Sequence, residues 1–389
     1  MDLISKIAGY LMDSINVVTG YGIPFIVILT LLVFVHELGH YLIARRNGVR
    51  VDVFSIGFGP ELFGWTAKSG TRWKFSAIPL GGYVKMFGDS DAASTPSAGV
   101  RTMTLEEQGV SFHHKRLGQR AAIVAAGPVA NFVFAILLFA ILYITVGQPF
   151  TPPDVGAVSP GSAAEKAGVQ TGDFILSIDG KAITRFEQVQ QIVQLNQGTP
   201  LDMVVRRNDA EVPLTVTPQV VEEKDIFGNM HRRGRIGVRG GSAPEYVKRD
   251  PATALWHAAG ETWNISFGTL KAMGEMVIGA RGTDELGGPI RIAQMSGEVA
   301  SLGIVALIGF MAVLSVNLGL INLFPIPVLD GGHLLFYAAE AVRGRPLGQR
   351  AQEYGFRIGL ALVLMLMVFA TWKDLERLPF FAFLKSLVT

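Results

Sequence analysis

Long apolar stretches separated by polar segments dominate the pattern of this chain. The first stretch runs from Ile23 to Ala44, and at about 1.5 Å per helical residue it can cross a hydrocarbon core of about 30 Å. It is too long for a removable signal peptide and lacks the small-residue cleavage site of one. Three further stretches follow, over Ala121–Val146, Leu302–Phe324 and Ile358–Trp372. The pattern predicts a bundle of about four transmembrane helices.

Basic residues lie next to these stretches at particular ends. They are Arg45, Arg46, Arg50, Lys115, Arg116, Arg120, Arg343, Arg345, Arg350 and Arg357. Because Lys and Arg beside a span favour the cytoplasm, we expect the first-to-second and third-to-fourth connections to be cytoplasmic. Both termini and the long segment 147–301 are then extracytoplasmic, and four spans satisfy every basic cluster.

Between the first two stretches, the segment Val51–Gly88 has a different pattern. It is rich in Gly, Val and aromatic residues, and polar and apolar positions alternate over Arg72–Ile78. This predicts strands in a hairpin or small sheet. Such an amphipathic β segment could dip into the bilayer edge, but the residues alone fit an ordinary cytoplasmic loop equally well. Asp89–Gln108 has the composition of a mobile polar linker.

A candidate soluble α+β domain is inserted at residues 150–220. Glycine- and serine-rich turns such as Ser159–Ala164 alternate with strand-like segments, including Phe174–Ile178 and Leu201–Arg206. The pattern resembles a PDZ domain of the bacterial, protease-associated type. A PDZ domain binds peptide ends or extended segments by adding a strand to a sheet edge. The alternative is a domain that blocks access sterically without binding a peptide.

Residues 251–279 form an ambiguous apolar segment before the third stretch. Apolar residues recur there at helical spacing, but four polar residues interrupt them, namely Glu261, Asn264, Lys271 and Glu275. A buried span rarely contains so many polar groups. The tryptophans at 256 and 263 fit a helix at headgroup depth, and a fifth span would place the C-terminal arginines outside. We therefore expect an interfacial helix.

Composition supports a membrane protein and limits its chemistry. Of the 389 residues, 49% are hydrophobic and 17% are charged, which leaves too little charge for an ordinary soluble surface. The formal net charge is +2, and we find no basic tract suited to nucleic acid. The chain has no cysteine, which excludes disulfides, thiolate zinc ligands and cysteine nucleophiles. Any metal must be held by histidines and carboxylates.

The first apolar stretch contains the motif His36-Glu37-Leu38-Gly39-His40. On a helix, positions i and i+4 share a face, so His36 and His40 can reach one zinc ion while Glu37 handles a zinc-coordinated water. Zinc lowers the pKa of such a water from about 15.7 to about 7, and Glu37 can then act as general base. An acid at the centre of a span costs on the order of 3 kcal/mol, so these polar residues need a partner such as a metal. The motif predicts a zinc site.

A catalytic zinc has three protein ligands and one open position. Candidates for the third ligand follow the third stretch, where Pro325 and Pro327 break the helix and Gly331 and Gly332 allow a tight turn. Non-helical backbone at membrane depth is tolerated only where it is buried or lines a cavity. Asp330 is the preferred third ligand, and His333 is the competing candidate.

The two motifs together resemble the site-2 protease family of intramembrane zinc proteases. The resemblance covers nearly the whole chain and includes Gly127-Pro128-Val129-Ala130-Asn131-Phe132 and Gly288-Pro289-Ile290. It is strongest to bacterial members with an inserted PDZ domain, the regulator-of-sigma-E protease group. Many enterobacterial members have two tandem PDZ domains, whereas this chain has room for one. A detailed substrate-gating scheme therefore does not transfer.

The resemblance implies roles for particular residues. It implies zinc ligation by His36, His40 and Asp330, with Glu37 as the catalytic acid and base. It places Asn322 near the substrate backbone, where an amide could hold an unwound strand or stabilise the oxyanion, although Asn322 could equally be a helix-packing hydrogen bonder. The region Gly81-Gly82-Tyr83 resembles the family's membrane-associated β-hairpin, which is thought to receive substrate in extended form.

These expectations define a multi-pass α-helical membrane protein with a membrane-associated β segment and one extracytoplasmic PDZ domain. The expected parts are 1–50 (first span), 51–118 (β-hairpin region and linker), 119–147 (second span), 150–220 (PDZ domain), 221–300 (linker and interfacial helix), 301–372 (third and fourth spans) and 373–389 (tail). The resemblance implies a zinc protease in the bacterial inner membrane, within an envelope-stress cascade. Its implied partners are the lipid bilayer and single-span substrates such as anti-sigma factors and signal peptide remnants.

Two other functions are compatible with parts of this pattern. A membrane scaffold could recruit partners through its PDZ domain and use zinc only structurally. A metal transporter would need polar residues along a continuous path, and the second and fourth stretches offer almost none. The protease remains the preferred interpretation.

Overall fold

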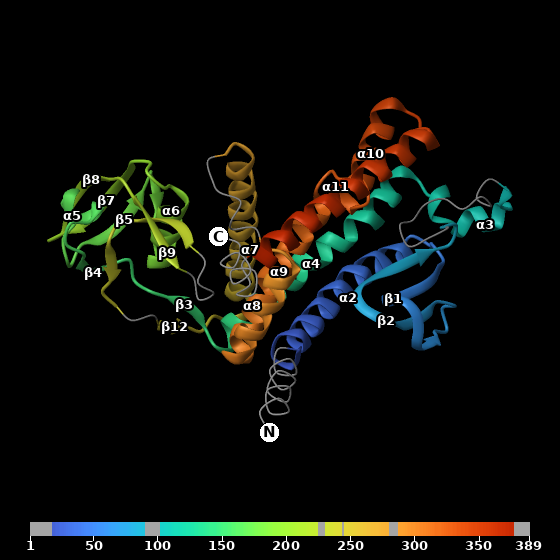
Figure 1. The fold of residues 1–389 in the computed structure, drawn as a ribbon, viewed down its shortest axis with the longest axis horizontal. Helices are drawn as coiled ribbons and strands as arrows, with labels where there is room; N and C mark the ends of the chain where they lie inside the picture. The colour runs from blue at the N-terminus through green and yellow to red at the C-terminus, as the bar shows by residue number, and fades with distance from the viewer. Residues whose placement is uncertain (1–17, 90–101, 225–229, 243–244, 280–286, 377–389) are drawn as a thin grey trace, which may run out of the picture. The chain divides into compact units, whose positions relative to one another are not determined.

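The computed structural model describes residues 18–89, 102–224, 230–242, 245–279 and 287–376 (Figure 1). The chain folds into two compact units. The first comprises Met1–Ile141, Leu255–Leu270 and Leu286–Thr389, and the second comprises Leu142–Ala254 and Lys271–Glu285.

In the described part of the chain, four helices are long and apolar enough to cross a membrane, as the four apolar stretches predicted. They are α2 (Ile23–Arg46), α4 (Leu117–Thr145), α9 (Ile304–Leu323) and α11 (Gln349–Glu376). The helix α2 begins with a proline in its first turn and ends before Gly48, whose φ of +69° favours glycine. The sidedness of the connections stays a prediction.

Small residues allow α4 to pack closely against both α2 and α9. A Cβ added to Gly39 of α2 would lie 2.7 Å from the Cβ of Ala130. A Cβ added to Gly319 of α9 would lie 3.1 Å from the backbone oxygen of Pro128. Helices in apolar surroundings associate through such close contacts between small residues. The helix bearing the His36–His40 motif is therefore held directly against α4.

Several shorter helices complete the first unit. They are η1 (Val18–Gly22), α3 (Leu105–Val110), η3 (Phe112–His114), α8 (Pro289–Ser301) and α10 (Asp330–Arg343). The sequence pattern did not predict α8 or α10. The N-terminus of α8 is capped from α11, because the buried Asp374 accepts hydrogen bonds from the backbone amides of Gly288, Ile290 and Arg291 at 2.9–3.1 Å.

The predicted β segment consists of β1 (Val51–Thr66) and β2 (Arg72–Met86), which pair antiparallel with several register shifts. Ile56 of β1 pairs with Gly82 and also with Phe75, so the first part of β1 lies between two parts of β2. Glycines with positive φ, at 57, 59 and 81, interrupt the strands where they bend. The sequence prediction of a small sheet is confirmed.

The predicted linker over Asp89–Gln108 is partly structured, which corrects that expectation. Asp89 is buried, and its carboxylate accepts hydrogen bonds from the Met86 amide and from His113, each at 2.9 Å. The helix α3 begins with a capping box formed by Thr104 and Glu107. Residues 90–101 of this segment lie outside the described residues.

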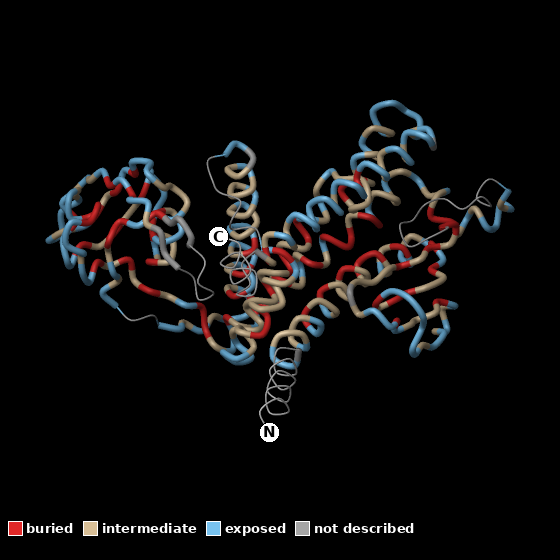
Figure 2. Tube along the Cα trace, viewed as in Figure 1, coloured by how far each residue is buried: buried red, intermediate tan, exposed pale blue. Residues whose placement is uncertain are grey.

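The second unit has an α+β fold. Its elements are β3 (Gln148–Phe150), β4 (Val155–Val158), α5 (Ala163–Lys166), β5 (Phe174–Ile178), β6 (Lys181–Ala182), α6 (Phe186–Leu195), β7 (Leu201–Arg207), β8 (Ala210–Val216), β9 (Gln219–Lys224), β10 (Met230–Arg235), β11 (Val238–Gly240) and β12 (Glu245–Val247). The largest sheet has the strand order β6-β5-β7-β8, and three two-stranded pairs, β9–β10, β4–β11 and β3–β12, complete the unit. Figure 2 shows buried residues along its strands and α6, where Ile175, Val189 and Met203 join one apolar core.

This unit extends beyond the expected domain limit at residue 220. Ile236 is buried in the same core, and Val238 of β11 pairs with Val158 of β4. The last strand-like segment that the sequence pattern indicated, Leu201–Arg206, lies before that limit. The residues that complete the core come later in the chain.

The helix predicted over residues 251–279 is present as α7 (Pro251–Val277). Asp250 caps its N-terminus, and Pro251 occupies its first turn. Trp256 and Trp263 are 78% and 70% exposed, which suits the predicted interfacial position. That position relative to a bilayer stays a prediction.

Candidate metal centre

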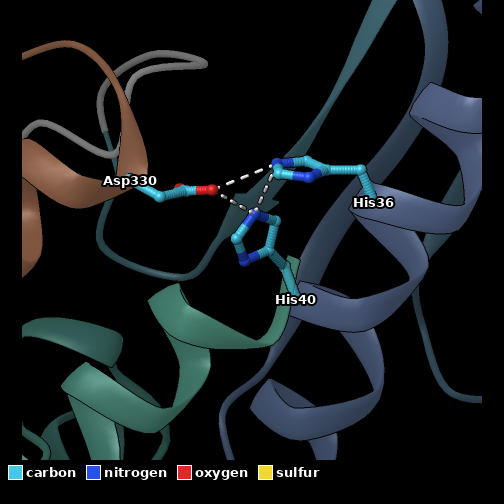
Figure 3. A group of neighbouring side chains, drawn as sticks. All are labelled: His36, His40 and Asp330. Carbon is cyan, nitrogen blue, oxygen red and sulfur yellow. Dashed lines mark hydrogen bonds and ion pairs between the residues drawn. The ribbon is translucent and has the colours of Figure 1, made fainter. Parts of the chain in front are cut away.

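Three predicted ligands meet at one point in the first unit. His36 and His40 extend from adjacent turns of α2 toward Asp330, the first residue of α10 (Figure 3). The Nε2 atoms of the two histidines lie 3.2 Å apart. Asp330 Oδ2 lies 3.1 Å from His36 Nε2 and 3.4 Å from His40 Nε2.

These distances fit a tetrahedral zinc ion. Zinc binds imidazole nitrogen and carboxylate oxygen at about 2.0–2.2 Å, so two tetrahedral ligands lie roughly 3.3 Å apart. The Oδ2 atom of Asp330 is buried and makes no hydrogen bond in the described part of the chain, although both imidazoles are close. A buried oxygen that converges with two nitrogens but lacks a hydrogen bond needs a cation. The donor set and its spacing therefore suit zinc.

The helix α4 forms the back of this centre. His40 Nδ1 donates to the backbone oxygen of Ile123 at 2.9 Å, which leaves the Nε2 lone pair free for a metal. Pro128 has no amide hydrogen, so the helix loses one hydrogen bond in this turn. A Cβ on Gly127 would lie 2.6 Å from His40 Cε1 and 2.8 Å from His36 Cε1, so only glycine leaves room for both rings.

A compact loop places Asp330. The chain leaves α9 through Pro325–Leu329, where the Leu329 amide donates to Ile326 O at 2.9 Å. Val328 has a φ of +103°, a strained conformation for a β-branched residue, and such strain is often found at functional sites. Gly331 and Gly332 lie in the first turn of α10, not in a separate tight turn as expected. They let the first turn of α10 lie close against the preceding loop, because a Cβ on Gly332 would lie 2.5 Å from Ile326 O.

A cavity of about 200 Å³ lies beside the three ligands. Its lining residues are His36, Glu37, His40, Gly82, Tyr83, Val84, Met86, Phe112, Val124, Asn322, Val328, Leu329, Asp330 and His333. Seven of the eight predicted site residues therefore line one space. Gly81 is the exception; its φ is +111°, and a Cβ there would lie 2.5 Å from Phe58. The competing candidate His333 lines the cavity but does not join the group of converging donor atoms.

Glu37 lies between the histidines and the sheet. Its carboxylate accepts a hydrogen bond from the backbone amide of Val84 in β2. A Cβ on Gly82 would lie 3.4 Å from Glu37 Cγ, so β2 passes directly beside this side chain. Gly82, Tyr83 and Val84 of β2 all line the cavity on this side.

Sequence reasoning missed the residues behind the ligands. Ile123, Gly127 and Asn131 are spaced by four, so they share one face of α4, and each lies against His36 or His40. Two of them, Gly127 and Asn131, belong to the second-span motif on which the family resemblance partly rested. These residues are four apart, as His36 and His40 are, and this shared spacing is the sequence signal that could have identified them.

Comparisons with known proteins agree with this site. A family model described as peptidase family M50 matches residues 24–366. A protein of Rhizobium meliloti, named as an inferred zinc metalloprotease, is 51% identical over 361 residues, covering 92% of this chain and 96% of that protein. Metalloprotease MmpA of Caulobacter vibrioides is 39% identical over 385 residues, covering 93% of this chain and 97% of its own length.

One similar solved structure matches part of the chain. The PDZ domain of an SdrC-like protein from Listeria monocytogenes is 18% identical and covers 23% of this chain and 86% of that domain, with a TM-score of 0.19. A likeness of this size carries no argument. The assignment of a PDZ domain to the second unit stays a prediction.

Proposed function

Because the chain belongs to peptidase family M50, the site-2 protease family, and is a zinc metalloprotease, we propose that it cleaves peptide bonds within transmembrane segments of single-span proteins. The observation that carries this proposal is the position of the converging donors. His36 and His40 lie within α2, one of the four helices that are apolar enough to cross a membrane. A protease centre at that depth is suited to substrates that lie in the bilayer.

His36, His40 and Asp330 are the proposed zinc ligands, and Glu37 is the proposed general base. Zinc, when bound, supplies an activated water and polarises the scissile carbonyl. The Glu37 carboxylate accepts a proton during attack and returns it to the leaving amine. The Val84 amide that bonds to Glu37 fixes the carboxylate beside the ligands. The chain itself thus supplies the orientation and the proton transfer.

A helical substrate hides its carbonyls in its own hydrogen bonds, so it must unwind before attack. We assign the outer edge of β2 to receive the unwound strand, because Gly82, Tyr83 and Val84 line the cavity next to Glu37. Gly81 would keep the strand bent beside this edge. Asn322 lines the same cavity from the last turn of α9 and would bind the substrate backbone or the developing oxyanion.

The substrate class and the location are further parts of this proposal. We propose anti-sigma factors and remnant signal peptides as substrates, in the bacterial inner membrane, with the second unit and both termini extracytoplasmic. The second unit would act as a PDZ domain that binds a peptide or excludes targets with a bulky extracytoplasmic part. Exposed apolar side chains on the outer face of α11, such as Leu364 and Met365, suit direct contact with lipid.

Cleavage of a trimmed single-span reporter by the full chain in detergent tests this proposal. Glu37→Gln spares the ligands, so it should retain zinc while lowering the cleavage rate by about 10²–10⁴-fold. Glu211→Gln, which changes an exposed acid on β8, is the matched control and should cleave normally. Equal product from the native chain and Glu37→Gln would instead favour a membrane scaffold with a structural zinc site.

A further inference from the structure

The side chain of Asn131 contacts His36 on the side of the ring away from the converging donors. Its amide lies 3.1 Å from His36 Nδ1. Asn131 is completely buried within α4, and its backbone oxygen accepts a hydrogen bond from Ser315 of α9 at 2.8 Å. A fully buried amide in an apolar helix is costly unless it has a definite partner. The ring of His36 is that partner.

Metal binding determines which nitrogen of His36 must carry the proton. A zinc ligand needs a free lone pair on Nε2, so the neutral ring carries its proton on Nδ1. An N–H at Nδ1 requires an acceptor. His40 meets the same requirement by donating from Nδ1 to Ile123 O. His36 needs an equivalent acceptor from α4.

The amide of Asn131 can meet this need through its oxygen. The two ends of an amide have nearly the same shape, so either can face the ring. With the nitrogen toward His36, the Oδ1 atom is buried and finds no hydrogen-bond partner among the residues that the structure describes. A half-turn of the amide brings Oδ1 to the Nδ1 proton and turns the NH₂ group to the side where Oδ1 lay.

We propose that Asn131 is a positioning residue for the zinc centre. Its Oδ1 accepts the Nδ1 proton of His36 and thereby holds the Nε2 lone pair toward the metal. Ile123 O does the same for His40, so α4 orients both histidines from one face. This inference rests on the proposed zinc ligation by His36.

The test compares zinc affinity among variants of the full chain in detergent, by competition with a chromophoric chelator. Asn131→Ala should raise the zinc Kd by about 10–100-fold, the usual effect of removing a hydrogen-bond partner of a ligating histidine. Asn131→Asp keeps an acceptor oxygen at the same place and should keep the Kd near the native value. Asn317→Ala is the matched control, because it removes a half-buried amide in α9 that contacts Thr269 at 3.2 Å, away from the histidines.

A second readout is the visible spectrum of the Co²⁺-loaded chains, which reports the ligand geometry directly. Asn131→Ala should change the intensity of the Co²⁺ bands, and Asn131→Asp should restore them. A native zinc Kd in Asn131→Ala, or loss of affinity in Asn131→Asp, would overturn the proposal. If Asn131→Ala does not fold, the zinc Kd and the Co²⁺ spectrum of Asn131→Asp alone test the proposal. Failure of the native chain to bind zinc would refute the ligand assignment itself.

Discussion

Two acids with buried carboxylate oxygens, Asp330 in the first unit and Asp173 in the second, are held in opposite ways. Asp173 is 1% exposed, and Arg207 donates to both of its oxygens at 2.7 Å, while the Gln170 amide donates at 2.8 Å. Asp330 Oδ2 is also buried, but among the described residues it has two imidazole nitrogens nearby and makes no hydrogen bond.

This difference separates a structural acid from a functional one. The chain itself satisfies the charge of Asp173, so the pair can stabilise the fold without any ligand. No described residue donates a hydrogen bond to Asp330 Oδ2, and the spacing of its neighbours suits a zinc ion. Burial alone therefore does not identify a site. A functional site is identified by the number and type of partners that the buried group has in the chain.

The largest expected effect comes from removing each acid in turn. Asp330→Ala should abolish zinc binding and lower cleavage by at least about a thousandfold, because two histidines alone make a poor catalytic zinc site. Asp173→Ala should keep zinc and activity but lower the free energy of unfolding by about 2–3 kcal/mol, because Arg207 loses its partner. Zinc content, reporter cleavage and thermal unfolding would be measured on both. Loss of activity in Asp173→Ala with its fold intact would contradict the comparison.

A smaller effect should follow from filling the space behind the histidines. Gly127→Ala places a methyl group 2.6 Å from His40 Cε1, so both rings must move from their present spacing. We expect the zinc Kd to rise by about 10–100-fold, as for other changes that misalign ligating histidines. Gly260→Ala is the control, since its Cβ would meet nothing within 4 Å on α7 and should stabilise that helix by up to about 1 kcal/mol. An unchanged zinc Kd in Gly127→Ala would mean that the rings have more freedom than their packing indicates.

Local patterns in the sequence predicted the spans, the small sheet and the convergence of His36, His40 and Asp330. The spans, the small sheet and the His36–His40 pair each rest on a short-range rule, namely a long apolar run, alternation, or an i, i+4 pair. Asp330 was preferred because it follows a broken helix end and because of the family resemblance. The roles of Asn131 and Ile123 could not be assigned, because they depend on which face of α4 packs against α2. Gly39 and Gly127 make that packing possible, but their sequence alone does not identify the opposing helix.

The elements that escaped prediction depend on contacts between distant residues. The helix α8 has a mixed composition, and its start is fixed by Asp374 from α11. The second unit ends later than expected because β11 pairs with β4, which precedes it by about 80 residues. Long-range pairing of this kind has no local signature in a single sequence.

The smallest expected effect is a pH dependence in the second unit. Burial alone would raise the pKa of Asp173, but the Arg207 guanidinium and the Gln170 amide hold the pKa below its ordinary value. A lowered folded-state pKa adds stability above the unfolded value of about 3.9, and this stability is lost as the pH falls through the folded pKa. Hydrogen exchange of β5 and β7 in the full chain should therefore be constant from pH 7 to about 5, after correction for intrinsic rates, and faster below about 4. In Arg207→Met, only the Gln170 amide still opposes burial, so the pKa of Asp173 rises toward or above its unfolded value, and the faster exchange below about pH 4 should shrink or disappear. The same pH profile in both chains would show that other groups determine the acid response, and that Arg207 does not satisfy Asp173 as zinc is proposed to satisfy Asp330.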